Sequence, residues 1–381
     1  MATDSEIRAQ RFTSTKWRNY PDDILPAWIA DMDLGIADEI VEAIQKPIDS
    51  RDLGYGSIEL QEKLLDAFTD RYLEKFNTPL DPALAVVGTD VVQSIFAAIL
   101  GFTQIGDQVI IQTPIYPPFL DAVISTGRTL SENPLIRTEQ GWEIDFGQLE
   151  QLAAQPECKL LLLCSPHNPT GKVFTQTELI RIANICVKHD ILVVSDEIHC
   201  DIVYSPNYHI PFASISPEFA SRVITMNSAT KSFNIAGLKC SITHFGSEEL
   251  MSLYNQSHPR IRGSVSNLAM IAATAAWQNA AKWLESTLAT LETNRDKTYQ
   301  FLGQSGLDVS LFPPQGTYLA WIDFRNSIAS SDPYQYLLEK AKVALSPGSD
   351  FGTPGIGWAR LNFATHPEIL DDILKRIAAV L

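Results

Sequence analysis

The chain has 381 residues, of which 45% are hydrophobic and 19% are charged, a composition typical of a globular protein long enough for two domains. Its formal net charge of -16 argues against nucleic acid and acidic membranes as partners, because both repel an acidic protein. The longest aliphatic run, at 160–163, is far too short to span a bilayer.

The N-terminal region, residues 1–45, is rich in Trp, Pro and Asp and shows little regular periodicity. Its first residues are polar and contain no apolar core of the kind found in signal peptides. The cysteines are odd in number, scattered and without a Cys-x-x-Cys pair, at Cys158, Cys164, Cys186, Cys200 and Cys240. These features predict a cytoplasmic protein with buried thiols and with neither a disulfide framework nor a metal site.

Residues 46–284 alternate between short apolar runs and helical patterns. The helix expected at 176–188 places Leu179, Ile182 and Cys186 at helical spacing. Strands that are apolar throughout and separated by helices predict a mostly parallel sheet covered on both faces. The expected strands are at 84–87, 109–112, 159–164, 191–195 and 223–226.

After residue 284 the pattern changes. An amphipathic helix is expected at 283–303, followed by short strands near 308–311, 317–323 and 357–363 and by a helix after Pro367. We therefore expect a large domain at 46–284, and a smaller α+β domain built from 285–381 together with the N-terminal segment 1–45.

Two polar motifs follow neighbouring expected strands. Asn168 lies in a turn rich in Pro and Gly after the strand at 159–164, and could aim its amide at a ligand. Asp196 ends the next strand, where α/β sheets place their binding sites. Taken alone, the first motif could be a plain turn, and the second could be a helix cap or a Mg²⁺ site.

Two basic motifs stand out later in the chain. Lys231 follows a buried strand among small and hydroxyl residues, and burial would lower its pKa and favour Schiff-base chemistry. Arg360 lies in an apolar strand, and its planar guanidinium matches a carboxylate with two parallel bonds. An exposed loop lysine and an edge arginine are the alternatives.

Together these motifs resemble the fold-type I pyridoxal-phosphate (PLP) enzymes, the aspartate aminotransferase superfamily, over residues 28–366. The resemblance implies PLP as cofactor and a large domain with a mostly parallel seven-stranded sheet between helices. It implies that Lys231 holds PLP as a Schiff base and transfers protons, and that Asp196 pairs with the pyridine nitrogen. Asn168 would bind the ring hydroxyl, and Arg360 the substrate α-carboxylate.

The resemblance also implies a phosphate site with Asp90 beside it. Asp90 would repel a phosphate unless its side chain caps the helix that follows. Lys239 stands where many relatives have arginine, so the charge is kept but the bidentate fork is lost. The expected phosphate ligands are the hydroxyls of Ser228 and Thr230, the amine of Lys239, and the first N–H groups of the following helix, on Val91 and Val92.

Two tyrosines complete the expected site. Tyr116 stands where the family stacks an aromatic ring on the cofactor and could assist catalysis, with core packing as the alternative. Tyr55 resembles the tyrosine that reaches the phosphate of the neighbouring subunit, which implies a homodimer.

The reaction is less well determined, because this superfamily supports several chemistries. Typical aminotransferases have a tyrosine three residues after the pyridine aspartate, whereas this chain has His199, which either contacts the ring hydroxyl or caps a loop. We predict a carbon–sulfur β-lyase acting on cystathionine, cysteine or an S-conjugate. An L-amino-acid aminotransferase, another PLP reaction and a non-enzymatic partner surface are the alternatives. The segments 28–33, 113–119, 196–201 and 345–352 resemble the cystathionine β-lyase branch.

Overall fold

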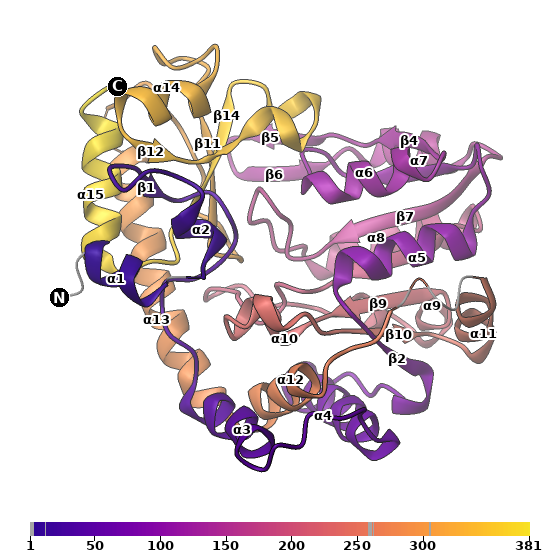
Figure 1. Cartoon of the computed structure of the whole chain (residues 1–381). Helices are drawn as coiled ribbons and strands as arrows, with labels where there is room; N and C mark the ends of the chain where they lie inside the picture. Colours follow the sequence, from indigo (N-terminus) through magenta and orange to yellow (C-terminus); the bar gives the residue numbers. More distant parts are fainter. Residues whose placement is uncertain (1–3, 12, 258–260, 262, 305) are drawn as a thin grey trace.

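The computed structural model describes residues 4–11, 13–257, 261, 263–304 and 306–381 and contains a central seven-stranded sheet (Figure 1). The strand order is β2–β10–β9–β8–β7–β3–β4. Strand β10 runs opposite to the other six strands of this sheet, so the predicted mostly parallel sheet is confirmed. The strands are β2 (Ala85–Gly88), β3 (Gln108–Ile111), β4 (Thr129–Glu132), β7 (Cys158–Cys164), β8 (Leu192–Asp196), β9 (Val223–Asn227) and β10 (Ser241–Phe245).

Alternate residues of the central strands point into different helical layers. On β7, Leu160 and Leu162 pack in a core with α5, α6 and α11, whereas Leu161 and Leu163 pack with α7 and α8. Because helices cover both faces, these strands are apolar at nearly every position. The helices of this region are α3 (Asp38–Asp49), α4 (Ile58–Phe76), α5 (Val91–Phe102), α6 (Pro117–Ser125), α7 (Phe146–Ala153), α8 (Gln176–Lys188), α9 (Pro217–Ala220), α10 (Ala229–Ser232), α11 (Glu248–Ser257) and α12 (Asn267–Asn279).

The structure adds two strands to the sheet predicted from the sequence. Strand β4 lies at the edge of the sheet and β10 is the antiparallel strand, and both are rich in polar residues. The hydroxyl of Thr243 and the ring of His244 are buried on β10, so this strand lacks the continuous apolar run used to find the others. Helix α8 agrees with the predicted 176–188, and a capping box formed by Thr175 and Glu178 fixes its start.

The remaining elements form a smaller unit that contains both ends of the chain (Figure 1). Its strands β11, β14 and β13 form one sheet, and β1 pairs in parallel with β12. These elements are α1 (Asp4–Gln10), α2 (Thr15–Arg18), β1 (Leu25–Pro26), α13 (Ala281–Thr298), β11 (Leu319–Asp323), α14 (Pro333–Lys340), β12 (Val343–Ala344), β13 (Ser346–Pro347), β14 (Trp358–Asn362) and α15 (Pro367–Ala378).

Two expectations for this smaller unit need correction. The strand expected near 308–311 is only an isolated bridge between Ser310 and Asp323, because the neighbouring prolines interrupt the backbone pairing. The helix expected at 283–303 is α13 followed by a π-helical segment, Tyr299–Gly303.

The hairpin of β5 (Leu135–Thr138) and β6 (Gly141–Ile144) links the large sheet to the smaller unit. Arg137 donates to Asp323 Oδ2 and Ser310 Oγ, both at 2.8 Å. Among the described residues, none of the helices has the length and apolar character needed to cross a membrane.

Candidate active site

The carboxyl ends of β7, β8 and β9 bring three predicted residues to one edge of the sheet. Asp196, the last residue of β8, pairs in register with Cys164 of β7 and Met226 of β9. Asn168 lies in the turn after β7, and Lys231 lies in α10, which begins directly after β9. A crevice beyond the carboxyl ends of parallel strands is the usual ligand site of such sheets.

Arg360 reaches this edge from β14 of the smaller unit. Its Nη1 donates to Asn168 Oδ1 at 2.9 Å, and its Nη2 donates to Trp28 O and Ser346 Oγ, both at 3.1 Å. The side chain is buried, which lowers its pKa to about 10, so the guanidinium remains charged at neutral pH. A rigidly held, buried guanidinium is suited to bind a carboxylate.

The amine of Lys231 points toward the N-terminal segment. Its Nζ donates to Ala30 O at 2.7 Å. Burial lowers its pKa to about 8; the Asp31 carboxylate opposes this change, and the Arg360 charge adds to it. An appreciable fraction of the amine is therefore neutral near physiological pH, as a nucleophile or proton acceptor requires.

Asp196 and His199 present buried groups that a cofactor ring could satisfy. Burial raises the pKa of Asp196 to about 7. The carboxylate accepts a hydrogen bond from the Ile198 N–H at 3.0 Å, and this bond opposes the change in pKa. Burial lowers the pKa of His199 to about 3, so its imidazole is neutral, and its Nδ1 has no hydrogen-bond partner among the described residues. A protonated pyridine nitrogen and a ring hydroxyl would provide the missing partners.

The start of α5 has the features of an anion site. Asp90 is its N-cap, accepting the Gln93 N–H at 2.8 Å, and its other oxygen lies 3.1 Å from Lys239 Nζ. The carboxylate therefore caps its own helix, as the sequence suggested. The first N–H groups, on Val91 and Val92, have no acceptor within the helix and can bind a phosphate.

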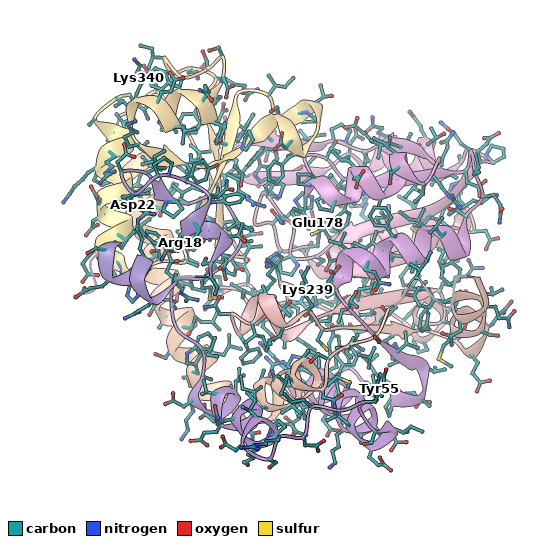
Figure 2. The ribbon with its side chains drawn as sticks, viewed as in Figure 1. Arg18, Asp22, Tyr55, Glu178, Lys239 and Lys340 are labelled. Atoms are coloured by element: carbon teal, nitrogen blue, oxygen red, sulfur yellow. The ribbon has the colours of Figure 1, made fainter. Side chains whose placement is uncertain are left out.

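Hydroxyl groups lie close to Lys231 at the start of α10. Ser228 caps this helix, accepting the Thr230 N–H at 3.1 Å, and the two hydroxyl oxygens are 2.7 Å apart. Lys239, labelled in Figure 2, is largely exposed, and its Nζ lies 3.1 Å from Asp90 Oδ2. These positions are consistent with the phosphate role predicted for all three residues.

The tyrosines differ in their surroundings. The Tyr116 N–H donates to Asn168 O at 3.2 Å, and burial raises the pKa of its phenol, which therefore stays protonated. Tyr55 is fully exposed and lies in an open pocket of about 770 Å³ with Gln61 and Met270, separate from the Lys231 cluster. Sequence analysis missed Tyr318, whose hydroxyl donates to Ala30 O at 3.1 Å; its only sequence signal is its place just before an apolar strand.

The fold and these buried groups define a PLP-dependent enzyme of fold type I, with PLP as its cofactor. The chain belongs to the family "Aminotransferase class I and II", which it matches over residues 29–377. Within this family it falls in the branch that contains cystathionine beta-lyases, the protein MalY and C-S lyases. The family and cofactor implied by the sequence motifs are therefore confirmed.

Relatives and solved structures support this placement. Cystathionine beta-lyase PatB of Bacillus subtilis is 34% identical over 361 residues, 94% of this chain and 93% of that protein. Protein MalY of Escherichia coli is 34% identical over 346 residues, 89% of this chain and 87% of that protein. The structure of cystalysin from Treponema denticola, which contains PLP, has a TM-score of 0.92 at 29% identity, covering 97% of this chain and 96% of that chain.

The lowered pKa of Lys231 predicts how the apo-protein takes up PLP. Only the neutral amine is nucleophilic, so the rate of colour development should rise with pH and level off above about pH 8. An ordinary lysine would extend the rise to about pH 10. Rapid-mixing absorbance measurements test this, with Lys231→Arg as a colourless control. A rate that still climbs steeply above about pH 9 would contradict a buried amine whose pKa lies well below that of an ordinary lysine.

Proposed function

We propose that this chain is a PLP-dependent carbon–sulfur β-lyase that acts on cystathionine, cysteine or a related S-conjugate. The observation that carries the proposal is His199, buried and neutral where typical aminotransferases have a tyrosine. Similarity over nearly the full length to proteins named cystathionine beta-lyase supports it. The proposed products are a thiol, pyruvate and ammonia.

The site residues divide the work of this reaction. Arg360 binds the substrate α-carboxylate, and its bond to Asn168 keeps the guanidinium oriented. Lys231, in its neutral form, accepts the α-proton. Tyr116, protonated by virtue of its raised pKa, donates a proton to the departing sulfur. The Cβ–S bond breaks with its electron pair on sulfur, and water then converts the three-carbon remainder to pyruvate and ammonia.

PLP supplies, when bound, a cationic ring that takes up the electron pair left on the substrate Cα. The buried Asp196 carboxylate would keep that ring protonated. His199 and Asn168 would hold the ring hydroxyl, and the start of α5 would hold the phosphate together with Ser228, Thr230 and Lys239.

A product assay tests the reaction type. The PLP-loaded protein is incubated with L-cystathionine without any keto acid, and the expected result is many turnovers of thiol, pyruvate and ammonia. A single turnover that leaves the cofactor in its amine form, and that continues only when a keto acid is added, would make the protein an aminotransferase. That outcome would refute the β-lyase proposal.

Replacement of Arg360 tests the carboxylate clamp. Arg360→Ala should raise KM for the amino-acid substrate about 100-fold, because a buried charge-assisted contact is lost, while PLP affinity changes little. Arg360→Lys keeps the charge but loses the two parallel bonds of a guanidinium, so its KM should lie between those of the wild type and Arg360→Ala. Steady-state kinetics and PLP titration make the measurement. An unchanged KM would remove Arg360 from the substrate site.

We further propose that the protein is a cytoplasmic homodimer in which Tyr55 completes the partner's phosphate site. The full exposure of Tyr55 at an open pocket, with the exposed Leu53 and Ile58 close to it in sequence, supports this proposal. Mixing Tyr55→Ala protein with Lys231→Ala protein should yield hybrids with one intact site and partial activity. Activity that never exceeds that of the separate variants would contradict a shared site.

A further inference from the structure

The segment 28–35 has no regular secondary structure, yet side chains hold most of its backbone carbonyls. Arg360 Nη2 donates to Trp28 O at 3.1 Å, and Lys231 Nζ donates to Ala30 O at 2.7 Å. Both functional cations therefore rest on this one strip of backbone. Its position determines where their hydrogen-bond acceptors lie.

Residues close in sequence to each cation hold the same strip. Asn362, two residues after Arg360, donates to Ile29 O and Asp31 O, both at 2.7 Å. Asn234, three residues after Lys231, accepts the Met32 N–H at 3.1 Å and donates to Met32 O at 3.2 Å. The strip thus bridges the large sheet and the smaller unit at the site.

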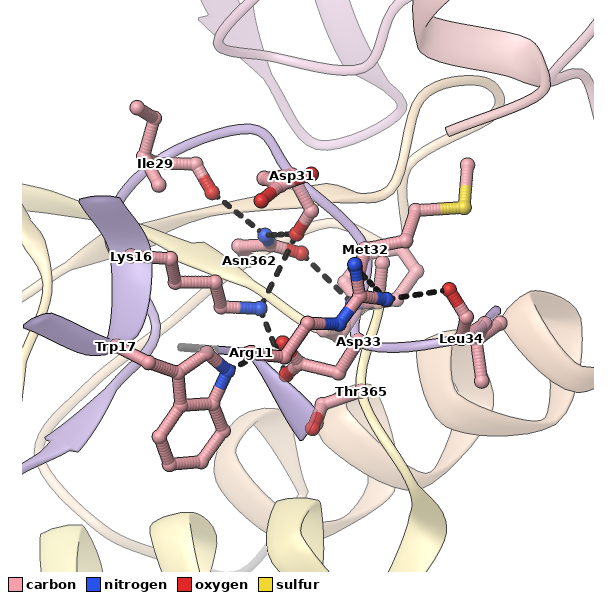
Figure 3. A network of polar contacts seen from close by, with 12 residues as sticks. Arg11, Lys16, Trp17, Ile29, Asp31, Met32, Asp33, Leu34, Asn362 and Thr365 are labelled. Atoms are coloured by element: carbon pink, nitrogen blue, oxygen red, sulfur yellow. Dashed lines mark hydrogen bonds and ion pairs between the residues drawn. The ribbon is translucent and has the colours of Figure 1, made fainter. Parts of the chain in front are cut away.

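A buried ion pair between Lys16 and Asp33 also holds the strip (Figure 3). Lys16 Nζ lies 2.8 Å from Asp33 Oδ2 and donates to Asp31 O at 3.1 Å. Trp17 Nε1 donates to Asp33 Oδ1 at 2.6 Å. The side chains of Lys16 and Asp33 are 0% and 1% exposed, so solvent does not weaken this pair.

A buried ion pair is an inefficient way to stabilise a fold, because desolvation offsets much of its attraction. Apolar side chains of similar size would fill the same space with comparable stability. They would not fix the Asp31 carbonyl or orient the Asp33 carboxylate. The geometry therefore indicates that the Lys16–Asp33 pair positions the strip and does not only stabilise the fold.

We infer that Lys16, Trp17 and Asp33 form a positioning anchor for the active site. The anchor holds the strip so that Trp28 O and Ala30 O stay opposite Arg360 and Lys231. Through Trp28 O it sets how well the guanidinium is aligned for a substrate carboxylate. This inference rests on the carboxylate role of Arg360 given under the proposed function, but not on the β-elimination step.

The test uses the PLP-loaded protein and L-alanine, which has no leaving group at Cβ and so reports binding without elimination. Lys16→Met combined with Asp33→Leu removes both charges while keeping the volume filled. We expect about tenfold weaker L-alanine binding, measured from the cofactor absorbance, with Tm and PLP affinity near wild type. The matched control is Lys297→Met with Asp371→Leu, an ion pair on α13 and α15, which should leave L-alanine binding unchanged.

A folded double variant that binds L-alanine as well as wild type would overturn the inference. If the double variant does not fold, Trp17→Phe decides, because it keeps both charges and an aromatic ring at this position while it removes the hydrogen bond to Asp33, and it should weaken binding about threefold. Wild-type affinity in Trp17→Phe would then overturn the inference. Arg360→Ala separates the two proposals: if it binds L-alanine normally, the carboxylate clamp fails and the anchor's action through the guanidinium fails with it, whereas if Arg360→Ala weakens binding and the folded anchor variants do not, only the anchor fails.

Discussion

Lys231→Ala is expected to lower turnover by about 10⁴-fold or more and to leave the protein without the yellow colour of bound PLP. The variant removes the amine that we propose both attaches the cofactor and accepts the substrate α-proton. Because Lys231 Nζ also donates to Ala30 O, the loss leaves that carbonyl with the Tyr318 hydroxyl as its remaining partner. Absorbance spectra and the thiol-release assay make the measurement.

Two controls separate this chemistry from a loss of charge. Lys231→Arg keeps a cation at the same place but should be equally inactive, because a guanidinium cannot form the bond to PLP. Lys188→Ala should remain yellow, since Lys188 pairs with Glu150 at the exposed end of α8 and lies outside the proposed site. A yellow, active Lys231→Ala protein would overturn the central assignment.

Asp196→Asn is expected to keep the yellow colour but to lower turnover by about 10²- to 10³-fold, because an amide cannot hold a proton on the cofactor ring. The amide oxygen can still accept the Ile198 N–H, so the local fold should persist. Spectra at several pH values and steady-state kinetics test both parts. Wild-type turnover would show that the carboxylate charge is not used.

The same substitution should stabilise the apo-protein at high pH. Burial raises the folded-state pKa of Asp196 from 3.8 to about 7, so the folded state holds its proton more tightly than the unfolded state does. Stability from this group is present below about pH 4 and falls by up to about 1.4 kcal/mol per pH unit until about pH 7. The amide of the variant does not titrate and has no such loss, so apo Asp196→Asn should melt above apo wild type at about pH 8, with a smaller gap at about pH 5. A gap that does not change with pH would contradict a buried Asp196 carboxylate whose pKa is raised.

Much of the large sheet could be predicted from the sequence, and so could the polar residues that meet at its edge. Strands buried on both faces are continuous apolar runs, so β7, β8 and β9 stand out, and polar residues just beyond them mark the site. Asp196, Asn168 and Lys231 can be found this way because the position of each is local to a strand end. Strand β10 escapes the same reasoning because its buried Thr243 and His244 interrupt the apolar pattern.

The sequence by itself determined which residues stand out as candidates for the chemistry. A Lys, Asp or Arg in an apolar setting is costly to bury, so it needs a compensating partner wherever it lies. Only the tertiary structure decided which groups meet. Arg360 and Asn168 are 192 residues apart and pair across two parts of the fold. The carbonyls of Trp28 and Ala30 were beyond sequence reasoning for a simple reason: every residue has the same carbonyl group, so only the path of the backbone selects the ones that hold Arg360 and Lys231.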